Sequence, residues 1–437
     1  MRVFLSAGEP SGDHHAAALV QSLKRRRPDV ECVGLGGPCM AAAGCRLVAD
    51  LTQLAVMWFL RVLLNIHRFV DLARRAERSF LDARPDVCVL VDFPGFHWWL
   101  AWRAKRHGIP VVFYCPPQIW AWASWRIHKM RRLVDHVLSA LPFEHDWFLA
   151  QGMSSTLVGH PFFDELRAAL ADTETDESAP GADSARGGDT RPAARPLVLL
   201  LPGSRTQEIE ANLVTILRAA ARTRLEVPEA QFVVATLHER HADRVRAEIR
   251  RLGPALAGLD LEVVAGRARS LMRSAACAIA VSGSVSLELL DARVPTVIVY
   301  RISGLAHIVQ SRFRHARFIT LVNLLAVHEP VGPPQPAWLP PREVAPADPE
   351  AIYPEYLSVQ DPSGHVAGHI VDWLSRPEAR AAVVARLEEV ARPIAGGGSA
   401  DRAAEAVLAL ASRSERRIGA PGGHAGGAAS RPARRAA

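Results

Sequence analysis

The chain has 437 residues, of which 49% are hydrophobic and 22% charged, and its formal net charge is +7. This length predicts two or three domains, and the composition is that of an ordinary globular protein, which excludes a disordered or fibrous chain. The six cysteines form no C-x-x-C pair and none lies at zinc-finger spacing from a histidine, which favours buried free thiols in a reducing compartment.

Apolar runs in the first half of the chain predict strands at 2–7, 30–37, 86–93, 109–115 and 135–141. Helical patterns such as 13–26 and 95–108 separate these runs. The alternation is typical of βαβ units and of a parallel sheet covered on both faces. Because the chain opens on a strand pattern, no signal peptide is expected.

A polar segment rich in Gly, Ala and Pro, residues 172–195, then predicts a flexible linker or surface loop. The α/β rhythm resumes at 196, with further strands expected at 231–237, 259–266, 276–283 and 294–301. We therefore expect an α/β protein with two doubly wound domains, at 1–171 and 196–360, followed by helices at 361–413 and a disordered basic tail at 414–437. Ligands of such sheets bind beyond the carboxyl ends of the strands, so the site is expected in a cleft between the domains.

The first strand-to-helix turn, "SAGEPSGDHH" (6–15), carries more polar chemistry than a connection requires. Gly8 and Gly12 allow a tight backbone, and Ser11 or Asp13 is expected to cap the helix. Capping leaves Glu9 unexplained. We interpret these residues as an acceptor-binding turn in which Glu9 is a candidate catalytic group; a well-made turn is the structural alternative.

The second such turn lies in "LLLPGSRTQEIE" (199–210). Gly203 permits close approach of a ligand, Ser204 and the helix N-terminus offer N–H donors, and Arg205 adds a charged fork. This combination indicates a phosphate or diphosphate site. A surface turn with an exposed arginine is the alternative.

The third turn, "VSGSVSLELL" (281–290), places Ser282, Gly283, Ser284 and Ser286 at a helix start. Glu288 follows about one turn later, where a carboxylate can accept from ribose hydroxyls. A helix-surface glutamate is the alternative.

The fourth turn, "VLVDFPGFHWW" (89–99), contains Asp92 at the end of a buried-looking strand. A carboxylate beside apolar residues should titrate abnormally or serve chemistry. Asp92 is therefore the first candidate for a general base, with a helix cap as the alternative.

The segment 54–70 is apolar almost all round. Its length and its charged residues disfavour a membrane span, but an interfacial helix and a buried core helix both remain open.

Together these residues resemble the lipid-A-disaccharide synthases, which are glycosyltransferases of the two-Rossmann-domain (GT-B) type. The similarity runs from about residue 1 to 412, outside the linker. The matching segments, in family order, are "AGEPSGD" (7–13), "GGPCMAAAG" (36–44), "QIWAWASWRIHKM" (118–130), "LPFE" (141–144), "VGHPFFDEL" (158–166), "LLPGSR" with "EI" (200–209), "SGSVSLE" (282–288) and "NLLA" (323–326). Through them the resemblance also assigns Glu208 and Asn323 to the donor site.

The resemblance implies that UDP-2,3-diacylglucosamine donates its sugar to 2,3-diacylglucosamine 1-phosphate, giving a β-1,6-linked disaccharide 1-phosphate and UDP. It implies inversion at the anomeric carbon, no cofactor and no required metal. It also implies peripheral action at the inner face of the cytoplasmic membrane, and it leaves a homodimer open.

The chain departs from the family pattern at three places. His97 stands where family members often carry Asn, and Gly95 stands where many carry Asp, which concentrates the base assignment on Asp92. The segment "YPEYL" (353–357) is separated from "NLLA" by a proline-rich stretch, so 327–350 is interpreted as an insertion.

Two other classes of function remain as alternatives. One is a different GT-B enzyme acting on a UDP-sugar, either a transferase or an epimerase. The other is a catalytically inactive protein that binds nucleotide or lipid. Nucleic-acid binding would rest on net charge and the arginine-rich tail alone, and no recognition module is visible, so it is not expected.

Overall fold

The computed structural model describes residues 1–55, 66–167, 195–256, 258–334, 339–394 and 396–419. The chain divides into two compact units. The first comprises Met1–Pro117, Arg131–Leu138 and the C-terminal segment from Ala400; the second comprises Gln118–Met130 and Ser139–Ser399.

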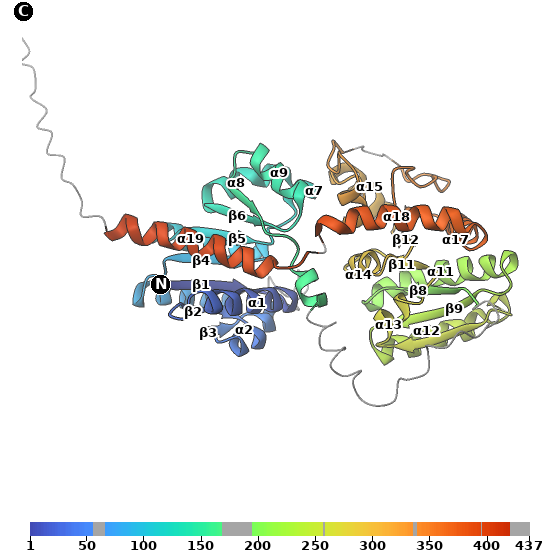
Figure 1. Ribbon diagram of the computed structural model, residues 1–437, viewed down its shortest axis with the longest axis horizontal. Coiled ribbons are helices and arrows are strands. Elements are labelled where there is room, and N and C mark those ends of the chain that lie inside the picture. The colour runs from blue at the N-terminus through green and yellow to red at the C-terminus, as the bar shows by residue number, and fades with distance from the viewer. Residues whose placement is uncertain (56–65, 168–194, 257, 335–338, 395, 420–437) are drawn as a thin grey trace, which may run out of the picture. The chain divides into compact units, whose positions relative to one another are not determined.

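The first sheet has seven strands in the order β3-β2-β1-β4-β5-β6-β7 (Figure 1). The strand pairs from β3 to β6 are parallel. The strands are β1 (Arg2–Ala7), β2 (Glu31–Gly36), β3 (Arg46–Asp50), β4 (Val87–Val91), β5 (Val111–Tyr114), β6 (His136–Ser139) and β7 (Ser155–Leu157). The helices of this part of the chain are α1 (Pro10–Arg26), α2 (Pro38–Ala42), α3 (Thr52–Ala55), α5 (Ile66–Asp82), α6 (Pro94–Arg106), α7 (Ile119–Trp122), η1 (Ser124–Arg126), α8 (Ile127–Leu133) and α9 (Pro142–Ala150).

The second sheet has six strands in the order β10-β9-β8-β11-β12-β13, and all its pairs are parallel. The strands are β8 (Leu197–Leu201), β9 (Gln231–Thr236), β10 (Leu261–Ala265), β11 (Cys277–Val281), β12 (Thr296–Arg301) and β13 (Glu355–Ser358). The helices of this part of the chain are α11 (Thr206–Glu226), α12 (Glu239–Leu252), η2 (Gly253–Leu256), α13 (Ala268–Met272), α14 (Val285–Asp291), α15 (Gly304–Phe313), α16 (Leu321–Ala326), α17 (Ser363–Ser375) and α18 (Pro377–Ile394). The last helix, α19 (Ser399–Gly419), belongs to the first unit from Ala400 onward.

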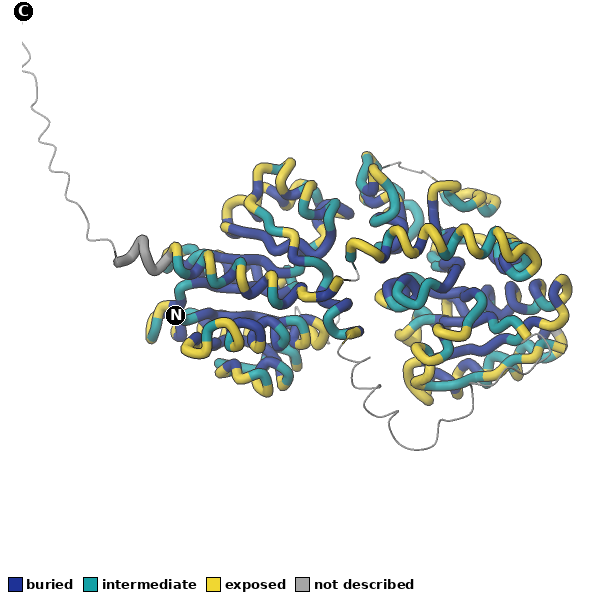
Figure 2. Tube along the Cα trace, in the orientation of Figure 1, coloured by how far each residue is buried: buried dark blue, intermediate teal, exposed yellow. Residues whose placement is uncertain are grey.

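Both faces of the second sheet are buried, as its uninterrupted apolar strands require. Val198 and Leu200 of β8 belong to one core cluster, which includes residues of α11 and α17. Leu199 and Leu201, which point to the opposite face, belong to a second cluster with residues of α14 and α18. Figure 2 shows the same pattern in both units, with buried strands under helices whose outer faces are exposed.

The structure confirms the two parallel α/β sheets expected from the sequence and adds three strands, β3, β7 and β13. Each of the three lies at the edge of its sheet. An edge strand has solvent on one side, and the residues of these three are mostly half-buried, so they lack the continuous apolar run that marks a central strand.

The C-terminal helix α19 ends at Gly419, beyond the limit of 413 expected from the sequence. Asp401 accepts hydrogen bonds from Ser22 and from Arg25 of α1, the latter over 2.8 Å, and Glu405 pairs with Arg26 over 2.7 Å. These contacts, together with buried Val407, join the end of the chain to the first unit.

Several sequence-based expectations concern residues outside those that the structure describes. They are the linker 172–194, most of the apolar segment 54–70, part of the insertion 327–350, and the tail beyond 419. Across the described ranges, no helix is both long enough and apolar enough to cross a membrane.

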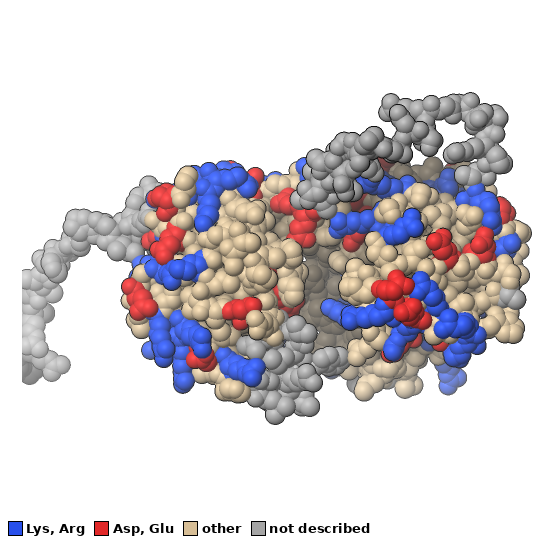
Figure 3. Space-filling view, turned by 90° about the horizontal axis from the view of Figure 1, so that it is seen from below, with Lys and Arg blue, Asp and Glu red and all other residues tan. Residues whose placement is uncertain are grey.

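Charged side chains of both signs are interspersed on the face shown in Figure 3. Many arginines of α12 are paired locally, for example Arg246 with Glu239 and Asp243, and Arg251 with Glu248. The described residues of this face therefore form no single basic stripe of the kind that a nucleic acid requires.

Neither Ser11 nor Asp13 is the N-cap residue of α1, contrary to the sequence-based prediction. The helix begins at Pro10 with Glu9 as its N-cap, so Ser11, Gly12 and Asp13 lie within its first turn. The buried carboxylate of Asp13 accepts backbone N–H groups from Gly37, Cys39 and Met40 over 2.8, 2.9 and 3.1 Å. Asp13 thus fixes the start of α2, and its predicted part in acceptor binding stays a prediction.

Replacing Asp13 by Asn should lower the free energy of unfolding by about 3 kcal/mol, because an amide nitrogen cannot accept and buried N–H groups lose their partner. Urea unfolding followed by tryptophan fluorescence measures this loss. Asp29→Asn is the matched control: Asp29 is exposed and forms a surface ion pair with Arg27, so its replacement should change stability by less than about 0.5 kcal/mol. A D13N protein of normal stability with a raised KM for the acceptor would instead support the binding role.

Candidate active site

A cavity of about 730 Å³ lies at the carboxyl edge of the second sheet. Residues that follow β8, β9, β10 and β11 line it, as expected for a doubly wound sheet. Eight of the ten residues predicted to bind the donor meet here: Gly203, Ser204, Arg205, Glu208, Ser282, Gly283, Ser284 and Glu288. Its wall also contains residues that sequence reasoning missed, namely Trp122, Arg269, Tyr300, Gln310, Ile319 and Leu357.

The turn after β8 is closed by Glu208. Gly203 has a φ of +117°, and a Cβ added there would lie 2.7 Å from Cβ of Glu208. The Glu208 carboxylate accepts the backbone N–H groups of Ser204 and Arg205 over 3.1 and 3.2 Å. The N–H donors expected to be open to phosphate are therefore occupied by a carboxylate of the same chain.

Arg205 supplies the charge of this turn. Its side chain is 82% exposed and lies 3.3 Å from the Glu208 carboxylate. An ion pair this exposed is weak, so the Arg205 guanidinium can leave Glu208 and bind a phosphate group in the cavity.

The turn after β11 is held by its own hydroxyl groups. Ser282 donates to the Ile319 carbonyl over 3.0 Å, and Ser286 donates to the Gly283 carbonyl over 2.8 Å. Ser286 is buried and does not line the cavity, and its hydrogen bond shapes the turn. Glu288 does line the cavity and accepts from Arg269 over 3.0 Å.

Asn323, which was also predicted to bind the donor, is fully buried and lies outside the cavity lining. Its amide oxygen accepts the N–H groups of Ile352 and Tyr353 over 2.9 and 3.0 Å. Its amide nitrogen donates to the Tyr353 carbonyl and to Glu355, both over 2.8 Å. Asn323 therefore anchors the chain where it enters β13.

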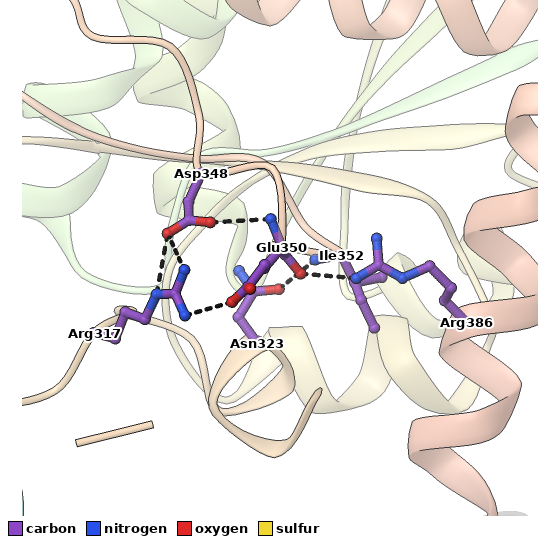
Figure 4. A network of polar contacts seen from close by, with 6 residues as sticks. All are labelled: Arg317, Asn323, Asp348, Glu350, Ile352 and Arg386. Carbon is purple, nitrogen blue, oxygen red and sulfur yellow. Dashed lines mark hydrogen bonds and ion pairs between the residues drawn. The ribbon is translucent and has the colours of Figure 1, made fainter. Parts of the chain in front are cut away.

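Polar contacts hold the end of the proline-rich insertion close to Asn323 (Figure 4). Arg317 donates to the Asp348 carboxylate over 3.1 and 2.8 Å and also pairs with Glu350. Arg386 of α18 donates to the Glu350 carbonyl over 2.7 Å. These contacts hold the chain in place just before it enters β13.

In the first unit, the register of β1 on β4 brings two predicted turns to the same edge. Ala7 pairs with Val91, so Gly8 and Asp92 follow neighbouring strands. A Cβ placed on Gly12 would lie 3.5 Å from the Val91 carbonyl and 4.0 Å from Cβ of Asp92. Glu9 is exposed at this edge, as is Ser11 in the first turn of α1. The structure thus collects both candidate carboxylates at one end of the sheet.

Asp92 occupies an unusual backbone position. Its φ is +52° and that of Phe93 is +47°, a conformation that costs about 1–3 kcal/mol for each such residue. Phe93, and not Asp92, is the N-cap residue of α6, which disfavours the helix-cap alternative. Burial raises the pKa of the Asp92 carboxyl above its ordinary value, while the Phe93 N–H and the charge of His15 act in the opposite direction.

Sequence reasoning did not assign three side chains around Asp92: His15 on α1, Ser6 on β1 and His97 on α6. In the sequence, His97 stands out only as a departure from the family pattern. The available signal was its position, a polar residue in the otherwise apolar first half of the helix, five residues after the carboxylate.

The comparisons with known proteins agree with this geometry. Residues 3–333 match the family model described as lipid-A-disaccharide synthetase. The chain is 33% identical over 412 residues to the lipid-A-disaccharide synthase of Anaeromyxobacter sp. strain K, covering 94% of this chain and 97% of the relative. It is 37% identical over 325 residues to that of Myxococcus xanthus, covering 74% and 81%.

Among solved structures, the UDP-GlcNAc 2-epimerase of Neisseria meningitidis, bound to UDP-GlcNAc, superposes with a TM-score of 0.57. The alignment covers 94% of this chain and all of that chain at 10% identity, so it speaks for the fold alone. Two parallel sheets, the order of the motifs and the extent of the family match lead to one assignment. The chain belongs to the lipid-A-disaccharide synthase family, a family of glycosyltransferases, and its fold is of the GT-B type.

Proposed function

We propose that this protein forms the lipid A disaccharide by transferring 2,3-diacylglucosamine from its UDP derivative to 2,3-diacylglucosamine 1-phosphate. The family match over 3–333 carries the proposal. The cavity of the second unit supports it, because a turn with Arg205 and a turn with Glu288 line a single space. In this proposal UDP binds there, with Arg205 at the diphosphate and Glu288 at the ribose.

The acceptor is activated in the first unit by Asp92. Its carboxylate takes the proton from the 6-hydroxyl of the acceptor while that oxygen attacks the anomeric carbon of the donor. The bond from that carbon to the diphosphate oxygen breaks, UDP leaves with the electron pair, and the configuration inverts. Arg205 stabilises the departing diphosphate. Glu9 orients the acceptor from the neighbouring turn.

The direct test is turnover of the purified full-length chain with the acylated UDP-sugar and the acylated sugar 1-phosphate, followed by mass spectrometry of the product. Unacylated UDP-GlcNAc in a parallel reaction separates this activity from that of another UDP-sugar enzyme. Tight UDP binding without any product would instead indicate an inactive binding protein.

Arg205→Ala should lower kcat/KM by at least about 30-fold, since a charge-assisted contact to the leaving group is worth roughly 2 kcal/mol. Steady-state kinetics with the acylated donor measure the effect. Arg251→Ala removes another exposed, glutamate-paired arginine on the neighbouring helix α12 and should leave kcat/KM within about twofold. A change of less than about threefold for R205A would refute the donor-site assignment.

Asp92→Asn should reduce kcat by about 10²–10⁴ while UDP affinity stays unchanged, because the variant keeps the size of the side chain but cannot take a proton. Burial raises the pKa of Asp92 above 3.8, and the base acts only when it is deprotonated. Wild-type kcat/KM should therefore fall as the pH drops through this raised pKa. That acid limb should be absent from the residual activity of D92N.

Glu9→Gln is the matched comparison, since Glu9 is the other candidate carboxylate at this edge. It should raise the KM for the acceptor with a smaller effect on kcat. Full kcat in D92N together with loss of kcat in E9Q would reverse the two assignments.

We also propose that the enzyme works as a peripheral protein at the inner face of the cytoplasmic membrane, because both substrates carry acyl chains. The outer face of α6 supports this: Trp99 and Trp102 are 40% and 44% exposed, and the Arg106 guanidinium lies 4.8 Å from the Trp102 ring centroid. Aromatic and basic side chains together suit an anionic lipid interface.

Replacing Trp99 and Trp102 together by Ser should lower the fraction of protein that sediments with anionic phospholipid vesicles by at least about threefold. Leu225→Ser, which removes a single side chain that is 81% exposed on α11, is the control and should sediment like the wild type. Unchanged sedimentation of the double variant would exclude α6 as the membrane contact.

A further inference from the structure

His97 is a fully buried histidine between the ends of two strands of the first sheet. Its Nδ1 lies 2.6 Å from the backbone carbonyl oxygen of Asp92, and its Nε2 lies 2.9 Å from the hydroxyl oxygen of Ser6 on β1. A carbonyl can only accept, so Nδ1 carries the hydrogen. Nε2 is then the acceptor, and the Ser6 hydroxyl donates to it.

Burial also fixes the charge of this ring. It lowers the pKa of His97 to about 4, so the imidazole is neutral at physiological pH and one tautomer satisfies both contacts. The surroundings are aromatic: the rings of Phe93, Phe96 and Phe113 lie with their centroids about 6 Å from that of His97. The His97 ring is therefore held in one orientation, in which Nδ1 donates a hydrogen bond to Asp92 and Nε2 accepts one from Ser6.

The group that His97 holds is the strained part of the turn. Asp92 and Phe93 are consecutive residues at positive φ, and neither is glycine. Residues in such conformations persist only when surrounding contacts determine them. The hydrogen bond to the Asp92 carbonyl is one such contact. Another is the packing of the Phe93 ring over Gly8, where any added Cβ would collide with the ring.

We propose that His97 is a positioning residue: its imidazole holds the Asp92 peptide in the left-handed conformation and so aims the Asp92 carboxylate at the acceptor hydroxyl. Through Ser6, the same ring links this peptide to β1, whose carboxyl end continues into the turn with Glu9. The inference rests on the proposed function, in which Asp92 is the base.

The family resemblance supplies an informative variant, because Asn often stands at this position. An Asn side chain can donate to the Asp92 carbonyl but is too short to reach Ser6 as well. H97N thus separates the contact that positions Asp92 from the link to β1.

The test compares H97F, H97N and S6A in the full-length enzyme. H97F keeps a buried ring but loses both hydrogen bonds, and kcat should fall by roughly 30- to 100-fold, since a displacement of about 1 Å at a reacting group has effects of this order. UDP affinity should stay within about twofold, because the donor cavity lies in the second unit. H97N should recover kcat to within about fivefold of wild type.

S6A leaves the imidazole in place and removes only its second partner, so it keeps the test informative if H97F does not fold. A kcat about three- to fivefold below wild type is expected, with KM for both substrates unchanged. Phe113→Leu is the packing control: it loosens the contact with the same ring without removing a hydrogen bond, and it should lower the melting temperature but leave kcat within about twofold.

A double-mutant cycle with D92N separates the possible failures. If His97 acts through Asp92, H97F should cause no further loss of kcat in the D92N background. Wild-type kcat in both H97F and S6A while D92N is inactive would overturn the inference and leave the proposed base intact. An added loss in the double variant, or an F113L effect as large as that of H97F, would also overturn it. Full kcat in D92N itself would instead refute the proposed base.

Discussion

Parallel pairing of strands is the constraint on which both candidate sites depend, one at each sheet. In a parallel sheet every strand delivers its carboxyl end to the same edge, so residues far apart in sequence meet there without any contact of their own. The pairing of Ala7 with Val91 places the Glu9 turn next to Asp92. The pairing of β8 with β11 does the same for the turns that carry Arg205 and Glu288. Buried apolar strands thus determine where the polar chemistry lies.

The cavity that is proposed to bind the donor is balanced in charge rather than strongly basic. Glu208 faces Arg205, and Glu288 faces Arg269. In the first pair the carboxylate also occupies two backbone N–H groups. In the proposed function, the diphosphate therefore competes with an anion of the same chain. Such an arrangement recognises a ligand by matching the geometry of several groups, because net positive charge alone would attract any anion.

At the carboxyl edge of the first sheet, by contrast, the backbone is strained and a carboxyl group is buried. Asp92 and Phe93 hold a backbone conformation that their side chains disfavour, and burial shifts the pKa of the Asp92 carboxyl upward. Packing around Gly8 and the neutral His97 keeps this conformation in place. Strain that is maintained by a well-packed surrounding is typical of sites where a reacting group has to be oriented before the substrate arrives.

The sequence by itself determined the two α/β sheets, the central strands and the turns that meet at their carboxyl edges, because buried strands and glycine-containing turns leave local patterns. It also indicated the family, through the order of its motifs. Side-chain partners could not be read in this way. Asp13 and Asn323 have the residue types of binding groups, yet each forms hydrogen bonds with backbone groups that lie 24 or more residues away. The edge strands β3, β7 and β13, and the contact of His97 with Ser6 across 91 residues, were likewise decided by the tertiary structure. The physical reason is common to all of them: a hydrogen bond depends on which groups the packed strands bring within about 3 Å, and no local pattern encodes that distance.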